Sequence, residues 1–157
     1  MEDRAVSGSW STAGAASASA RRIETFFSTL TPGSLDGITA VYAEDARFKD
    51  PFSDVQGIAA IRRIYEHMFA TLDEPRFVVT GRVLQGRDCV LIWDFHFRFK
   101  RIRPATRQVV RGCSHLMLDD HGRIAVHRDY WDAAEELYEK IPVLAGLMRW
   151  LKKRAGN

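Results

Sequence analysis

The stretch from Tyr42 to Tyr65, YAEDARFKDPFSDVQGIAAIRRIY, places the carboxylate of Asp50 immediately before Pro51, between two segments with apolar patterning. Proline fixes its own φ and pushes the preceding residue into an extended conformation, so we expect Asp50 to be held at a bend. A carboxylate fixed beside Phe48 and Phe52 is a candidate proton-transfer group. The same residues are equally consistent with a second interpretation, in which Asp-Pro only starts a turn.

Apolar residues recur at helical spacing on both sides of this stretch. The spacing predicts helices over Ala20–Leu30, over Ser34–Tyr42, and from Gly57 to an exit marked by Pro75. Ser34 is the expected cap of the second helix. Between the second and third helices, we expect Asp45–Phe52 to be extended.

From Arg76 onward the apolar period changes to two, which is typical of strands. Four strands are predicted, over Phe77–Leu84, Cys89–Lys100, Gln108–Leu118 and Arg123–Tyr130. The second strand puts aromatic side chains on one face (Trp93, Phe95, Phe97, Phe99) and polar ones on the other (Asp94, His96, Arg98, Lys100). A last helical stretch follows over Asp132–Leu151. Helices followed by a mostly antiparallel sheet predict an α+β domain.

Composition sets the outer limits of the fold. A chain of 157 residues that is 46% hydrophobic and 27% charged is sufficient for one globular domain, which we place at residues 19–157. Residues 1–18 are rich in Ser, Ala and Gly and are expected to form a flexible tail.

Charge, cysteine and hydropathy patterns indicate which partners to expect. Basic residues are spread along the chain and the net charge is only +3, which does not favour nucleic-acid binding. No run of 18 apolar residues predicts a membrane span, and a cytoplasmic location is expected. Cys89 and Cys113 have no metal-ligand spacing and are expected to be reduced. No cofactor motif is present, and His127 with Asp129 offers too few ligands for a metal site.

Several motifs together resemble the nuclear transport factor 2-like superfamily. They are YAEDARFKDP at 42–51, the helix start at Gly57, the turn DDHGRI at 119–124 and the strand end HRDYW at 127–131. The resemblance covers about residues 20–132 and implies a curved sheet wrapped by helices into a cone. Within the superfamily, the motifs are most similar to ketosteroid isomerases and SnoaL-like polyketide cyclases. Many relatives pair through the outer sheet face, so the resemblance also implies a homodimer.

The resemblance to ketosteroid isomerases assigns roles to individual residues. Asp50 matches the catalytic aspartate base of these enzymes. Tyr42 and Tyr65 match two tyrosines of the hydrogen-bond network at the cavity floor, and Trp131 matches a tryptophan of the cavity wall. These four residues agree with the family pattern.

Two other positions depart from that pattern. The oxyanion-hole tyrosine falls at Phe26 or Phe27, and the protonated aspartate that partners it falls at Ser114. Losing one oxyanion donor typically costs about 2.7 to 4 kcal/mol of transition-state stabilisation. The chain is therefore not expected to be a true ketosteroid isomerase unless other donors compensate.

Strand alternation predicts an inward column of His127, Asp129 and Trp131. One interpretation is structural, with a hydrogen-bonded core histidine and an aspartate that partners a buried arginine. The other is an acid/base pair across the cavity from Asp50, in which the carboxylate holds the imidazole in one tautomer. Both interpretations stay open at the level of sequence.

The segment HRDYWD at 127–132 is also similar to limonene-epoxide hydrolases, in which Asp129 would activate or position a water. Those enzymes also use an inward Arg-x-Asp pair on a neighbouring strand. The inward positions here are predicted to be Trp93, Phe95 and Phe97. A register shift by one residue would instead turn the polar face of that strand inward.

The alternating aromatic row is typical of a sheet core, but its outer members would line any cavity in an open cone and favour a lipophilic ligand. The predicted function is proton transfer on a small lipophilic molecule by an isomerase, cyclase or hydratase. The catalytic residues would be Asp50, His127 and Asp129. Substrate contacts would come from Phe26, Tyr42, Tyr65, Trp93, Phe95, Phe97, Ser114 and Trp131. A noncatalytic binding or dimerising module is the alternative, and an epoxide hydrolase-like enzyme the third.

Overall fold

The computed structural model describes residues 9–101 and 105–136. The helices are α1 (Ser9–Ser28), the 3₁₀ helix η1 (Pro32–Ala40), α2 (Ile58–Thr71) and α3 (Ala133–Glu136). The strands are β1 (Tyr42–Lys49), β2 (Asp54–Gln56), β3 (Leu72–Gln85), β4 (Asp88–Phe99), β5 (Gln108–Leu118) and β6 (Ile124–Tyr130). Helices followed by a mainly antiparallel sheet confirm the α+β class.

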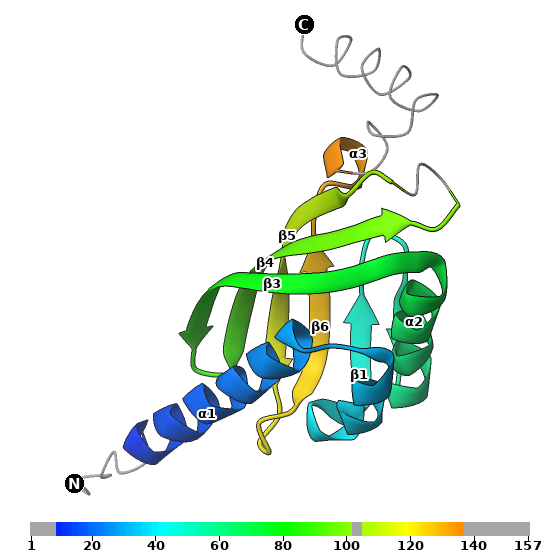
Figure 1. The fold of residues 1–157 in the computed structure, drawn as a ribbon. Coiled ribbons are helices and arrows are strands. Elements are labelled where there is room, and N and C mark those ends of the chain that lie inside the picture. The colour runs from blue at the N-terminus through cyan, green and yellow to red at the C-terminus, as the bar shows by residue number, and fades with distance from the viewer. Residues whose placement is uncertain (1–8, 102–104, 137–157) are drawn as a thin grey trace, which may run out of the picture.

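The strands form one six-stranded sheet in the order β2-β1-β6-β5-β4-β3. Neighbouring strands are antiparallel except β1 and β6, which are parallel. Helix α1 packs against β3, and α2 packs against η1, β1 and β3 (Figure 1). The inner sheet face and these helices therefore enclose the core.

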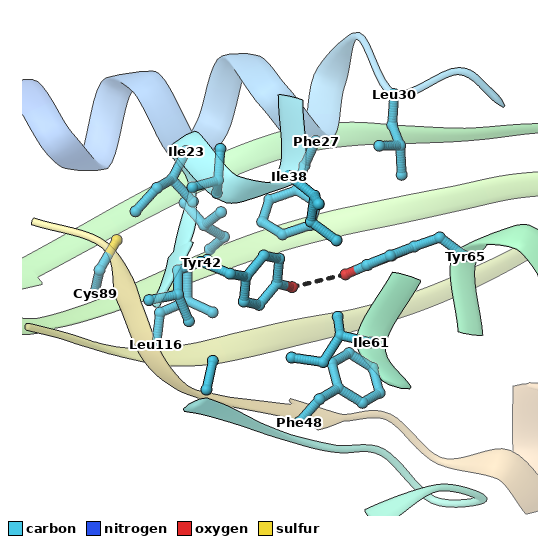
Figure 2. Packing of buried hydrophobic residues seen from close by; sticks show 14 of the residues in the cluster. Ile23, Phe27, Leu30, Ile38, Tyr42, Phe48, Ile61, Tyr65, Cys89 and Leu116 are labelled. Carbon is cyan, nitrogen blue, oxygen red and sulfur yellow. Dashed lines mark hydrogen bonds between the residues drawn. The ribbon is translucent and has the colours of Figure 1, made fainter. Parts of the chain in front are cut away.

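Alternation along β4 fixes which face is inner. Cys89, Leu91, Trp93 and Phe97 are 5% exposed or less, whereas Ile92 on the other face is 46% exposed. This confirms the predicted register and excludes the one-residue shift that would have turned the polar face inward. Buried side chains from the helices and strands form the core on this side, among them Ile23, Ile38, Tyr42, Ile61 and Leu116 (Figure 2). Leu35 and Ile124 belong to the same cluster.

The N-terminal part of the fold corrects two predictions. Helix α1 begins at Ser9, so the predicted flexible tail is wrong for residues 9–18, while residues 1–8 lie outside the described residues. Alanine, the best helix former, is frequent in this stretch and explains a helix without a clear apolar period. Thr31, not Ser34, caps η1, and Ser34 completes a reciprocal capping box as its third residue.

The end of α2, the strand β2 and the last helix also compare with the sequence prediction as follows. Helix α2 starts after Gly57 as predicted, with φ of 89° at that glycine, but it ends at Thr71. Pro75 therefore lies inside β3, where an edge strand tolerates proline and the pairing register shifts between Asp73 and Arg76. Strand β2 is too short to have been predicted. Of the helical stretch predicted over Asp132–Leu151, the described part is α3.

No helix among the described residues combines the length and the hydropathy needed to cross a membrane.

Gly112 of β5 lies opposite Trp93 of β4 and leaves room for two tryptophans. A Cβ atom at this position would lie 2.5 Å from an indole carbon of Trp93 and 2.9 Å from Cβ of Trp131. We predict that Gly112→Ala lowers the free energy of unfolding by about 1–3 kcal/mol, because overpacking forces these rings to move. Urea denaturation measures the change.

The matched control is Gly37→Ala, because nothing lies within 4 Å of the Cβ it would add. This substitution should change stability by less than about 1 kcal/mol. Equal effects of the two substitutions would show that Gly112 is not a packing requirement.

Candidate functional site

A cavity of about 530 Å³ opens between the inner face of the sheet, helix α2 and the β1–β2 turn. Its wall is largely aromatic, formed by Phe48, Phe52, Tyr65, Phe77, Trp93, Phe95, Phe97, Phe99 and Trp131. Its polar lining residues are Asp50, Ser53, His67, Thr71 and Asp129. An aromatic wall with few polar groups is the composition expected of a small-molecule site.

The aromatic row of β4 serves both as core and as cavity wall. Phe95 stacks on Phe77 with ring centroids 4.4 Å apart, and Phe97 lies 5.1 Å from Phe95 and from Phe99. Trp93 is buried and meets Phe77 edge to face at 5.5 Å. Both interpretations given to this row at the level of sequence therefore apply, since residues that pack the sheet also line the cavity.

Asp129 has two hydrogen-bonded neighbours on the inner face, and a third residue joins the network through Ser114. Ser114 lies directly opposite Asp129 in the β5–β6 register, and its Oγ donates to Asp129 Oδ1 at 2.5 Å. Trp93 Nε1 donates to the same Ser114 Oγ at 2.9 Å. His127 Nε2 lies 2.7 Å from Asp129 Oδ1. The serine hydroxyl is thus bound to the carboxylate, while Oδ2 makes no hydrogen bond to any described residue.

The network continues from His127 to two tyrosines. The Tyr42 hydroxyl lies 2.6 Å from His127 Nδ1 and 2.8 Å from the Tyr65 hydroxyl. Figure 2 shows Tyr42 from β1 and Tyr65 from α2 pointing toward one another. His127 is 2% exposed and Tyr42 is fully buried, so this chain of groups connects Asp129 to the cavity through Tyr65 without solvent.

These distances fit two proton arrangements. With neutral His127, Nε2–H donates to Asp129, Nδ1 accepts from the Tyr42 hydroxyl, and Tyr42 accepts from Tyr65. With protonated His127, Nδ1–H donates to Tyr42 and Tyr42 donates to Tyr65. The Tyr65 hydroxyl then keeps its proton and can donate it as a hydrogen bond toward the cavity. The protonation state of His127 therefore sets whether Tyr65 can donate a hydrogen bond to a ligand.

Burial raises the pKa of both tyrosines well above the ordinary value of 10. For Tyr65 the negative charge of Asp129 raises the pKa further, and for Tyr42 the neighbouring Tyr65 does so. Both groups consequently remain phenols at neutral pH. They can relay or donate hydrogen bonds, but they cannot serve as phenolate bases.

Asp50 combines its two proposed roles. Its Oδ1 accepts the backbone N–H of Phe52 at 2.7 Å and that of Ser53 at 2.5 Å, which is the turn expected after Asp-Pro. The carboxylate nonetheless lines the cavity, and its Oδ2 makes no hydrogen bond within the described residues. The turn holds one oxygen and leaves the other for a ligand.

The remaining predicted site residues divide between the cavity and an inner chamber of about 30 Å³. Tyr65, Trp93, Ser114, His127 and Asp129 line the chamber together with Phe27. Phe26 and Tyr42 line neither space: Phe26 packs edge to face on Phe27, with centroids 5.4 Å apart, and Tyr42 is buried behind Tyr65. The predicted set omitted apolar lining residues that share the apolar pattern of their elements, among them Phe48, Phe77, Phe99 and Met68.

Within residues 9–101 and 105–136, no three side chains of His, Cys, Asp or Glu gather where they could bind one metal ion. His67 is exposed and lies at the cavity rim.

A sequence profile of the SnoaL-like domain family matches residues 23–127. The chain belongs to this family. The fold agrees with the resemblance to nuclear transport factor 2-like proteins, and the buried Tyr42, Tyr65 and His127 lie inside or at the end of the matched region.

Three solved structures are similar to this chain in fold at low sequence identity. One is a hypothetical protein with a ketosteroid isomerase-like fold from Catenulispora acidiphila, in complex with trimethylamine; it is 16% identical, covers 73% of this chain and 88% of its own, and has a TM-score of 0.65. An LEH-like epoxide hydrolase from M. tuberculosis is 19% identical over 87% and 97%, with a TM-score of 0.65. A Jannaschia protein described as a SnoaL-like polyketide cyclase is 14% identical, covers 86% of this chain and 94% of its own, and has a TM-score of 0.64.

The Tyr42 hydroxyl should be required for stability, because among the described residues it is the only group that hydrogen-bonds to both His127 and Tyr65. We predict that Tyr42→Phe lowers the free energy of unfolding by about 1–3 kcal/mol, since it leaves a buried nitrogen without its partner. Urea denaturation followed by tryptophan fluorescence measures the loss.

Tyr130→Phe is the control, because Tyr130 is 48% exposed and its ring keeps its contact with Arg128 without the hydroxyl. It should change stability by less than about 0.5 kcal/mol. A Tyr42→Phe protein as stable as the unaltered one would refute the buried network.

Proposed function

We propose that this SnoaL-like protein is an acid/base enzyme that moves a proton on a small lipophilic molecule, in a reaction of the isomerase, cyclase or hydratase type. One observation carries the proposal: Asp50 and Asp129 both line an aromatic cavity, and each is anchored through Oδ1 while its Oδ2 has no hydrogen bond to a described residue. A carboxylate held in place with one free oxygen is suited to accept or deliver a proton.

Asp50 is the proposed general base. The two backbone donors to Oδ1 fix its orientation, so Oδ2 can accept a proton from a carbon or hydroxyl of a bound molecule without reorganisation. The aromatic wall would hold that molecule and exclude water. A proton removed by Asp50 has to be matched by stabilisation of the charge left on the substrate.

Tyr65 is the proposed source of that stabilisation. It lines the cavity, stays protonated because of burial, and can donate toward a ligand when His127 carries a second proton. His127 and Asp129 then act as the acid and positioning pair behind it. Ser114 is a poor oxyanion donor because its hydroxyl is bound to Asp129, which argues further against a true ketosteroid isomerase.

An exchange experiment tests this proposal without a known product. Lipophilic ketones are incubated with the protein in D₂O, and deuterium incorporation next to the carbonyl is followed by NMR. We predict exchange above the uncatalysed rate, and a loss of about 10²- to 10⁴-fold in Asp50→Asn, because removing the base removes the proton-transfer step.

Asp36→Asn is the control, because Asp36 lies on η1, is exposed, and pairs with Arg62 outside the cavity. It should exchange at the unaltered rate. Full turnover in Asp50→Asn on any substrate that is found would remove Asp50 from the mechanism. Binding without turnover in every variant would favour the noncatalytic binding module instead.

A water-adding reaction is the second candidate. The inner chamber of about 30 Å³ exceeds the ~10–15 Å³ that one water needs, and Tyr65, Ser114, His127 and Asp129 line it. A water held there beside Asp129 would support hydratase chemistry. Epoxide hydrolysis has less support, because the inward β4 positions where an Arg-x-Asp pair was sought are Trp93 and Phe95. Product mass in the same incubations separates addition of water from isomerisation.

We propose a homodimer through the outer sheet face, as the family resemblance implies. That face carries polar groups, but large exposed apolar residues also lie on it, at Val78, Val83, Ile92, Met117 and Tyr130. We predict that the protein sediments as a dimer and that Ile92→Lys, at a position 46% exposed, sediments as a monomer, because a buried unpaired charge is costly. A monomeric unaltered protein would contradict the proposal.

A further inference from the structure

We infer that the cavity takes a lipophilic amine, bound as its ammonium cation. This inference rests on the cavity of the proposed function and names the charge of the ligand. Its basis is the pairing of an aromatic wall with two carboxylates, together with the absence of a lysine or arginine among the described lining residues.

The wall presents ring faces and edges at close range. Phe77 and Phe95 are stacked, Phe97 continues the row on β4, and Trp131 meets Phe52 on the opposite rim at 5.5 Å. The face of an aromatic ring carries partial negative charge, so several rings around one volume attract a cation, and a tertiary or quaternary ammonium also buries its alkyl groups. Neutral lipophilic groups gain only the second effect.

The two carboxylates lack a matching positive charge. Asp50 forms no ion pair with a described lysine or arginine, and the described ionic partner of Asp129 is His127. Even with His127 protonated, Asp50 remains uncompensated. Two backbone N–H groups donate to Asp50 Oδ1, but a carboxylate beside an aromatic wall without an ionic partner still carries a desolvation cost, and a ligand cation would offset it.

Lys49 and Arg128 line a neighbouring pocket that shares Asp50 and Asp129 with this cavity, but each has another partner. Lys49 pairs with Asp54 at 2.9 Å, and Arg128 lies over the Tyr130 ring at 5.0 Å. Lys100 Nζ donates to the carbonyls of Phe69 and Ala70 at the end of α2, at 3.0 Å each. A lipophilic anion would therefore meet two carboxylates and no lysine or arginine among the described lining residues, with His67 only at the rim, so the charge pattern selects against anions.

Binding of three probes of similar shape tests the inference. They are benzyltrimethylammonium, its neutral carbon isostere neopentylbenzene, and phenylacetate as an anion. Isothermal titration at low salt gives each Kd. We expect the ammonium ion to bind about tenfold more tightly than the isostere, and phenylacetate to bind more weakly than both.

Variants assign that preference to the cavity. Asp50→Asn and Asp129→Asn keep an oxygen that accepts the same hydrogen bonds but remove the charge, so each should lower the ammonium preference by about threefold or more. Phe95→Leu removes a ring face without changing charge and should also lower it. Asp88→Asn alters an exposed outer-face partner of His115 and should leave the preference unchanged.

Equal or tighter binding of the neutral isostere would overturn the inference, as would an ammonium preference that survives both aspartate substitutions and Phe95→Leu. The proposed function fails separately. Asp50-dependent deuterium exchange with no ammonium preference would leave acid/base catalysis standing, whereas an ammonium preference without exchange would support a binding protein.

Discussion

The hydrogen bonds accepted by Asp129 Oδ1 hold the inner face of this protein together. Ser114 of β5 donates its hydroxyl proton to that oxygen, and Nε2 of His127, on β6 with Asp129, also hydrogen-bonds to it. Trp93 of β4 fixes Ser114, and Tyr42 of β1 fixes His127. Buried polar groups must find partners, so these bonds tie the neighbouring strands β1, β6, β5 and β4 together on the inner face. The aromatic wall is built around them.

The same arrangement gives the site its chemical character. Asp129 and Asp50 each use Oδ1 for structure, one within the sheet and the other within a turn, and both residues line the cavity. Anchored groups need little reorganisation when a ligand arrives. The chain from His127 through Tyr42 to Tyr65 adds a donor whose direction depends on one proton. The residues that hold the inner face together are therefore the ones to which the proposed chemistry is assigned.

Much of the architecture could be predicted because it follows local periodicity. Alternation over Cys89–Lys100 predicted the aromatic wall, and the bounds Gln108–Leu118 were correct. The inward positions of His127 and Asp129 follow from the same rule. Their contact with each other is also a two-residue relation, since both lie on one face of one strand.

Other features depend on relations between distant segments, which a single sequence does not reveal. Adjacent Phe26 and Phe27 look alike in sequence, and only the placement of α1 on the sheet decides that Phe27 enters the chamber. Pro75 was interpreted as a helix exit because the edge position of β3 is a property of the whole sheet. The bond from Ser114 to Asp129 required the β5–β6 register.

The most direct test of the central claim is NMR of the His127 imidazole in protein labelled with ¹⁵N-histidine. We predict an Nε2–H proton whose exchange with water is slow and whose chemical shift reflects the hydrogen bond to Asp129. In Asp129→Ala this slowly exchanging signal should disappear. An imidazole whose N–H exchanges freely with solvent, or whose signals are unchanged by removal of the carboxylate, would contradict the buried network from which the site is built.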